Sequence, residues 1–178
     1  MKLIPTKISD CFKIEPEIFK DQRGSLVNTF NNRIFSKNGL ETSFPSDFYS
    51  VSNKGVLRGL HFQIPPFEHT KLVYCVDGKI MDVIFDMRKA SRTYAKFETF
   101  ILDSDKADMI YIAPGIAHGF CVLSKMAIVG YKVSSLYSKE HDLGIMWNSV
   151  GINWPNKNPI ISKRDSLFPT FQNFNNPF

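Results

Sequence analysis

The sequence has few cysteines, and none of them form a closely spaced pair. The count is odd, and the three residues, Cys11, Cys75 and Cys121, lie far apart in the sequence. This pattern indicates neither a CxxC zinc site nor a disulfide framework. Cys75 and Cys121 lie in apolar runs, where buried thiols are common. Thiols without disulfide partners are typical of a reducing compartment, so we expect a cytoplasmic protein.

Long apolar runs are also lacking. Pro5 interrupts the N-terminal segment before the apolar core of a signal peptide can form. No apolar run approaches the roughly 20 residues that a membrane helix needs. The sequence therefore predicts no membrane partner.

Basic residues are numerous but do not cluster. Lys and Arg total 22 against 17 Asp and Glu, which gives a net charge of +5. The basic residues are scattered singly, which argues against a nucleic-acid groove and favours a small anionic partner such as a phosphorylated molecule. The 16 Phe residues provide apolar area for a core or for stacking against a ring.

Turn signals recur between short β-branched and aromatic runs, which predicts an all-β sandwich or barrel in one domain. Two short helices are expected, at 34–38 and 104–107, and an irregular segment is expected from residue 156 onward. The predicted strands lie at 25–30, 72–76, 79–85, 97–102, 109–112, 119–123 and 127–133.

The clearest predicted hairpin joins 72–76 to 79–85 through Asp77-Gly78, because Asp-Gly favours two-residue hairpin turns. In the second strand, Asp82 and Asp86 alternate onto the same face as two isoleucines. This pattern indicates a face that is part core and part polar cavity. We interpret Asp86, near the strand end, as solvated and Asp82 as the more informative carboxylate.

Only four histidines are present, and two lie in dense motifs. His61 lies in GVLRGLHFQ, residues 55–63, and His118 lies in PGIAHGF, residues 114–120. Together these motifs resemble the two signatures of the cupin barrel. A metal-binding cupin would have His at position 63, where this chain has Gln63, a poorer ligand for a transition metal. We therefore expect no metal and no cofactor; a set of His61, His118 and either Glu68 or His69 remains the metal-binding alternative.

At full length the sequence resembles the dTDP-4-dehydrorhamnose 3,5-epimerase family. The matching motifs run in the family's order over about residues 1–165: 19–24, 54–63, 71–73, 82–88, 114–120, 131–132, 144–148, 154–155 and 162–165. The resemblance implies a cupin jelly roll, spanning 1–178 as one domain. Residues 1–50 would supply N-terminal strands and a dimer arm, 51–135 the barrel core, and 136–178 a C-terminal segment that carries Asp165.

The resemblance also implies the chemistry, which is proton transfer beside the C4 ketone of a nucleotide-linked deoxysugar, in deoxysugar biosynthesis for surface polysaccharide. His61 would be the base, and Asp165 would hold its tautomer. Lys71 would stabilise the enolate, and Tyr131 would protonate the opposite face. A homodimer that exchanges an N-terminal strand between subunits is implied as well.

Substrate binding is assigned by the same resemblance. Arg23 and Arg58 would bind the diphosphate, because a guanidinium fork matches phosphate oxygens. The other residues expected to contact substrate are Phe19, Asn28, Ser46, Gln63, His118 and Tyr137.

Four positions that help hold the nucleotide and sugar in the family differ in this chain. The family commonly has Glu where this chain has Asn28, and Gln, Asn and His where it has Ser46, Phe48 and Tyr49. These changes alter the hydrogen-bonding groups of the pocket. The nucleotide (dTDP, CDP or GDP), the sugar (hexose or heptose) and the inverted carbon (C3, C5 or both) therefore stay open. A non-catalytic sugar-binding cupin and a metal-dependent cupin enzyme are the competing functions.

Overall fold

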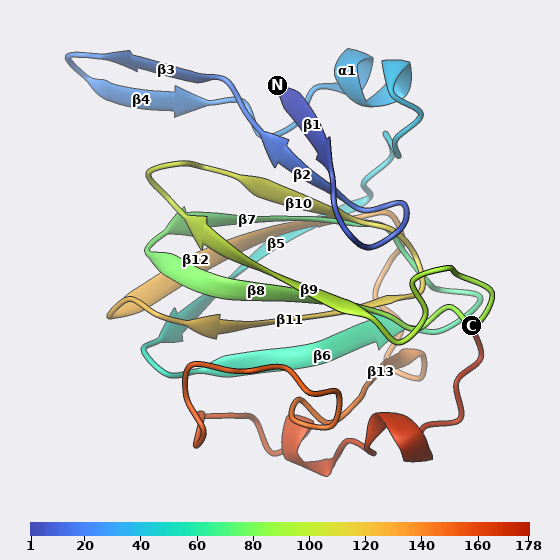
Figure 1. Ribbon diagram of the computed structural model, residues 1–178. Coiled ribbons are helices and arrows are strands. Elements are labelled where there is room, and N and C mark those ends of the chain that lie inside the picture. The colour runs from blue at the N-terminus through green and yellow to red at the C-terminus, as the bar shows by residue number, and fades with distance from the viewer.

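The computed structural model describes all 178 residues as two packed β-sheets with a projecting hairpin (Figure 1). One sheet has six strands in the order β1-β2-β10-β7-β12-β5, and the other has five in the order β13-β6-β11-β8-β9. The first comprises β1 (Lys2–Pro5), β2 (Phe12–Glu15), β10 (Met109–Ile112), β7 (Lys71–Asp77), β12 (Met126–Val133) and β5 (Ser46–Asn53). The second comprises β13 (Asp142–Gly144), β6 (Leu57–Gln63), β11 (Ile116–Val122), β8 (Lys79–Asp86) and β9 (Phe97–Asp103).

The remaining elements are short and lie outside the sheets. The hairpin β3 (Ile18–Asp21) and β4 (Gly24–Val27) projects from the body in Figure 1. Helix α1 (Asn32–Lys37) begins where the Asn31 side chain accepts a hydrogen bond from the Ile34 N–H, an ordinary N-cap. Two 3₁₀ turns, η1 (Asp165–Leu167) and η2 (Phe171–Asn173), interrupt the C-terminal segment.

Three buried clusters fill the spaces around the sheets. The first lies between the sheets and includes Ile80 and Ile84 of β8. The second lies on the other face of β8, where Val83 and Phe85 pack with aromatic residues of the C-terminal segment. Alternate residues of β8 thus enter two different cores, as the two-residue period of a strand requires. The third lies under α1, around Phe35.

Most of the predicted elements are confirmed. The strands at 97–102, 109–112, 119–123 and 127–133 correspond to β9, β10, β11 and β12, and the helix at 34–38 corresponds to α1. The predicted strand at 25–30 is shorter, since β4 ends at Val27. The segment after 156 has only its two 3₁₀ turns, in line with the irregular structure expected there.

The predicted hairpin through Asp77-Gly78 is wrong. β7 pairs with β10 and β12, whereas β8 pairs with β11 and β9, so the two strands belong to different sheets. Gly78 has φ +84°, which suits a tight turn. The turn carries the chain across the sandwich, because each strand finds its pairing partners elsewhere.

Two smaller predictions are also wrong. Residues 104–107 form a hydrogen-bonded turn after β9, in which the N–H groups of Lys106 and Ala107 both bond the Asp103 carbonyl. Asp86 is completely buried instead of solvated. Its carboxylate accepts hydrogen bonds from Arg88, Ser91 and Thr93, and these bonds offset the cost of burying the charge.

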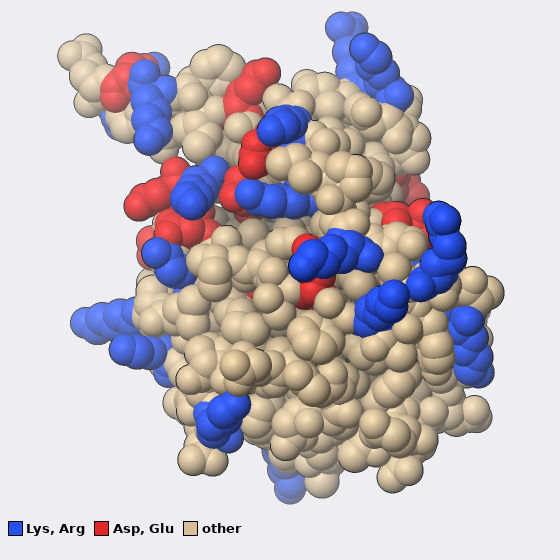
Figure 2. Space-filling view, in the orientation of Figure 1, with Lys and Arg blue, Asp and Glu red and all other residues tan.

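The surface carries its basic residues as isolated side chains. On the face shown in Figure 2, Lys and Arg are dispersed and several lie beside Asp or Glu. None of the helices has the length and apolar character needed to cross a membrane.

Candidate active site

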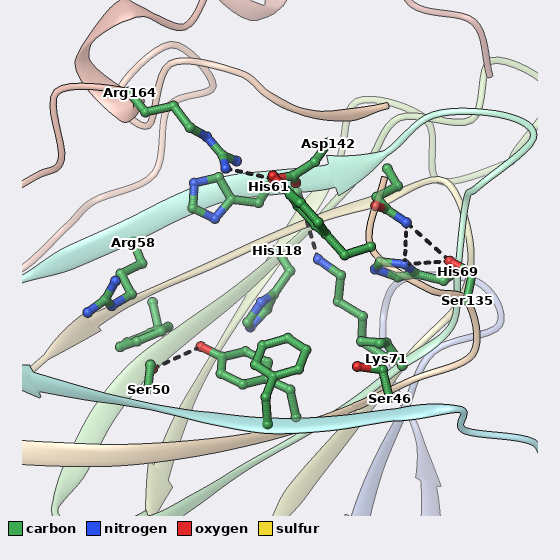
Figure 3. Close-up of a pocket in the computed structure, with 16 residues that line it drawn as sticks. Ser46, Ser50, Arg58, His61, His69, Lys71, His118, Ser135, Asp142 and Arg164 are labelled. Carbon is green, nitrogen blue, oxygen red and sulfur yellow. Dashed lines mark hydrogen bonds and ion pairs between the residues drawn. The ribbon is translucent and has the colours of Figure 1, made fainter. Parts of the chain in front are cut away.

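A cavity of about 300 Å³ opens between the two sheets. Its walls carry eight of the twelve residues that the sequence assigned to catalysis or substrate binding: Ser46, Arg58, His61, Gln63, Lys71, His118, Tyr131 and Tyr137. Figure 3 shows several of these side chains converging from opposite sheets. Residues separated by up to 91 positions in the sequence therefore meet in one space.

The His61 imidazole lies on β6 and is backed by a buried carboxylate. His61 Nε2 is 2.9 Å from Asp165 Oδ1, an ion-pair distance, although the atoms lie off the line of an ideal N–H bond. Burial lowers the pKa of His61, while the Asp165 carboxylate opposes that shift. With Nε2 facing the carboxylate, Nδ1 is left as the nitrogen that can take a proton.

Asp165 is itself held by the barrel. Its Oδ2 accepts the Gly59 backbone N–H at 3.2 Å, and its own N–H donates to Ser162 Oγ at 3.0 Å. Burial raises the pKa of Asp165, but hydrogen bonds and the neighbouring His61 outweigh it and the net pKa is lowered. The carboxylate thus stays ionised beside the imidazole.

Close backbone approach positions β6 beside β11. Gly59 has φ +136°, and a Cβ there would lie 2.6 Å from the Gly119 Cα. Two facing glycines are therefore required at this point. The approach brings His61 opposite His118 in the sheet register.

Lys71 enters the cavity from β7 in the other sheet. Its Nζ donates to the His61 backbone carbonyl at 3.1 Å. Burial lowers the pKa of Lys71 to about 8, an effect that Asp142 and Asp82 partly counter. Lys71 is therefore a fixed cation beside the imidazole, with a proton that is less tightly held than usual.

Tyr131 faces this region from β12. The side chain is 9% exposed, its ring stacks on Phe48 at 4.9 Å, and its hydroxyl lies 3.4 Å from Ser50 Oγ. Burial raises the pKa of Tyr131, so the phenol keeps its proton. His61 and Tyr131 thus stand on opposite walls.

His118 forms a second histidine–carboxylate pair. Its Nε2 lies 2.7 Å from Oδ2 of Asp82, a carboxylate that is completely buried. Asp82 therefore reaches the polar interior that its strand pattern indicated, and it orients His118 in the cavity wall.

The proposed binding residues have differing environments. The Arg58 guanidinium donates to Ser52 Oγ and to the Val51 carbonyl at the cavity wall. The Gln63 amide is occupied by protein partners, since it donates to the Phe67 carbonyl and accepts from the Ser138 N–H. Tyr137 is 68% exposed, at the rim. Gln63 therefore shapes the cavity wall, and its contact with substrate stays a prediction.

Three predicted binding residues lie outside the cavity. Phe19 and Arg23 are on the projecting β3–β4 hairpin, and Asn28 follows it. Phe19 is 58% exposed, and Arg23 pairs with Asp21 at 2.6 Å. Within one chain they do not meet the other residues, and their role stays a prediction.

Sequence reasoning did not single out two charged residues of the cavity wall, Asp142 and Arg164. Arg164 Nη1 lies 2.6 Å from Asp142 Oδ2, and its guanidinium lies 5.3 Å from the centre of the Phe168 ring. The position of Arg164 next to Asp165 was the available signal, since the segment that delivers the carboxylate also delivers the guanidinium.

The alternative metal set does not assemble. No three His, Cys, Asp or Glu side chains lie close enough together to share an ion, because His61 and His118 each face a separate carboxylate.

Comparison with known proteins points to one family. Residues 5–173 match the family model described as dTDP-4-dehydrorhamnose 3,5-epimerase. A protein of that name from Shigella flexneri is 42% identical over 168 residues, with 93% of each chain covered.

Solved structures similar to this chain are also nucleotide-sugar epimerases. A dTDP-4-dehydrorhamnose 3,5-epimerase from Bacillus anthracis, with TDP and PPi bound, superposes with a TM-score of 0.92 at 40% identity, covering 95% of this chain and 98% of that one. A 3′-monoepimerase from Streptomyces bikiniensis, in complex with dTDP-quinovose, superposes with a TM-score of 0.89 at 30% identity, covering 94% and 87%. Such neighbours place the fold among the cupin jelly rolls expected from the sequence.

Proposed function

Because this chain belongs to the dTDP-4-dehydrorhamnose 3,5-epimerase family, we propose that it inverts C3 and C5 of a dTDP-linked 4-keto-6-deoxy sugar. The observation that carries the proposal is the placement of a histidine–carboxylate pair and a protonated tyrosine on opposite walls of one cavity. Inversion at carbon needs one group to remove a proton and another to return it on the other face.

The first step is proton removal. His61 Nδ1 takes the proton from the carbon beside the ketone, and the electron pair moves to the C4 oxygen as an enolate. Asp165 stabilises the imidazolium that results. A neutral imidazole is available near neutral pH because the pKa of His61 is lowered.

The second step is proton return. The Lys71 ammonium lies beside the base and stabilises the enolate oxygen as charge develops. Tyr131 donates its proton to the other face of the carbon. Exchange with solvent then removes the proton from His61 and restores the phenol. The same groups serve the second carbon after the sugar shifts in the cavity.

Arg58 is the proposed diphosphate contact within the cavity, because it lines the same cavity as His61 and comes from the same strand, β6. The relatives act on or bind dTDP-linked compounds by name, which favours thymidine over the cytidine and guanosine alternatives. The changed residues Ser46 and Phe48 line the same cavity and are the positions where a different sugar would be accommodated.

We also propose a cytoplasmic homodimer in which the β3–β4 hairpin reaches the partner. Its support is the projection of the hairpin in Figure 1, with Phe19 and Leu26 exposed at its surface. Arg23 and Phe19 would then enter the partner's cavity as binding residues. Light scattering on the purified protein should give twice the chain mass.

Deuterium exchange tests the proposed function. Chelator-treated protein in deuterated water should incorporate deuterium at C3 and C5 of dTDP-4-keto-6-deoxyglucose, read by NMR, with CDP- and GDP-linked sugars as comparisons. Substituting His61→Ala should abolish exchange, whereas His141→Ala, which lies outside the cavity, should not. Binding without exchange would instead establish a sugar-binding module, and activity that needs an added metal would establish a metal-dependent enzyme.

A further inference from the structure

His69 is a cavity-wall residue that the catalytic steps above do not use. It lies in the connection between β6 and β7, and Figure 3 shows its ring beside Lys71, with one nitrogen bonded to its neighbours and the other directed toward the Lys71 side chain. That second nitrogen, Nε2, is buried and has no hydrogen-bond partner. Buried polar atoms almost always have partners, so this one calls for a ligand atom.

The partners of Nδ1 determine which nitrogen carries the proton. The Gln63 amide is oriented by the Ser138 N–H, which donates to Gln63 Oε1 at 2.7 Å. The other end of the amide therefore presents N–H groups, and Gln63 Nε2 lies 3.1 Å from His69 Nδ1. Ser135 Oγ lies at the same distance from Nδ1. We assign Nδ1 as the acceptor of the Gln63 bond, and this assignment places the ring proton on Nε2.

The ring is neutral at the pH of the reaction. Burial and the positive charge of Lys71 lower the pKa of His69 to about 3. A neutral ring adds no second full positive charge beside the Lys71 ammonium. The cavity thus offers two adjacent donors, one charged and one neutral.

We propose that His69 contacts the substrate and donates its Nε2–H to the C4 oxygen, sharing with Lys71 the negative charge that develops there. This inference rests on the proposed function, because it assigns a second donor to the enolate of that reaction. Two fixed donors directed at one developing oxyanion stabilise the transition state more than the ketone.

Leucine and glutamine at position 69 separate this role from a structural one. His69→Leu removes the donor and keeps the bulk, and it should lower kcat about 10²-fold while KM changes little. His69→Gln returns an amide N–H near the original Nε2 and should recover most of that loss. His141→Gln is the matched control, because His141 bonds Ser138 in the adjoining loop and does not line the cavity.

The measurement is kcat and KM for wild type and the three variants, with the thermal midpoint of each as a check on folding. Wild-type activity with an unchanged kcat in His69→Leu would overturn the inference and leave the proposed function standing. Equal losses in His69→Leu and His69→Gln that follow a lower thermal midpoint would also overturn it, since they indicate a structural role. An inactive wild type would remove the proposed function itself, and this inference with it.

Discussion

The two walls of the cavity handle protons in opposite ways. On the five-stranded sheet, His61 and His118 each face a carboxylate, at 2.9 and 2.7 Å. On the six-stranded sheet, Lys71 bonds a backbone carbonyl and Tyr131 lies against a serine hydroxyl, with no carboxylate in contact. One wall therefore favours accepting a proton, whereas the other presents groups that already carry one. The fold separates base from acid by assigning them to different sheets.

The largest expected effect comes from removing the negative charge behind His61. Asp165→Asn places an amide N–H opposite Nε2 and drives the ring proton to Nδ1, the nitrogen that must be free. We expect kcat to fall about 10³-fold, by analogy with the loss of an orienting carboxylate in a catalytic triad.

Asp103→Asn is the matched control for that variant, since Asp103 pairs with Lys79 away from the cavity. Steady-state kinetics on both variants makes the test. A kcat in Asp165→Asn within tenfold of wild type would show that the two walls do not differ in the way described.

A smaller effect is expected on the acid wall. Tyr131→Phe keeps the stacking on Phe48 but removes the proton, so net inversion should slow about 10²-fold. Deuterium exchange at the carbon facing His61 should continue, because the base is untouched. NMR that follows exchange and inversion in the same sample separates the two steps.

Tyr111→Phe removes a hydroxyl that bonds the Glu41 backbone outside the cavity, and it should leave both rates unchanged. If Tyr131→Phe abolished exchange and inversion together, proton return would not belong to the opposite wall.

The smallest expected effect is the change of kcat/KM with pH. His61 must be neutral, so kcat/KM should rise with pH through a pKa below 6.5. Lys71 must be charged, so kcat/KM should fall again above its pKa of about 8. Each limb changes kcat/KM by up to tenfold per pH unit.

Lys71→Arg tests the assignment of the upper limb. A guanidinium keeps its charge to much higher pH, so the fall near pH 8 should disappear even if the rate is lower throughout. A fall that persists in Lys71→Arg would assign this limb to another group.

The sequence was informative where local chemistry decides structure, and less so where distant pairing decides it. Strand patterns predicted the barrel, and the His61 and His118 motifs singled out two residues that line one cavity. The Asp77-Gly78 turn suggested a hairpin, but turn chemistry does not specify which sheet receives the next strand. Asp86 was misinterpreted because its hydrogen-bond partners lie in a loop with no periodic pattern.

The cavity's charged rim was hardest to foresee. Asp142 and Arg164 are 22 residues apart and form an ion pair, because β13 pairs with β6 and the C-terminal segment passes beside them. His69 appeared only as part of a metal alternative. Its unpartnered nitrogen is visible only once Gln63 and Ser135 are placed around it.

The C-terminal segment has a consequence for how the protein loses function. Scattered backbone hydrogen bonds at Ile160, Pro169 and Phe178 and aromatic side chains in the second core hold it on the barrel, and it carries Asp165 outside both sheets (Figure 1). Segments with few backbone bonds open at lower free energy than the sheets they cover. Warming should therefore inactivate the protein before the two sheets separate: the tail detaches first, which uncovers the second core and leaves His61 without its counterion.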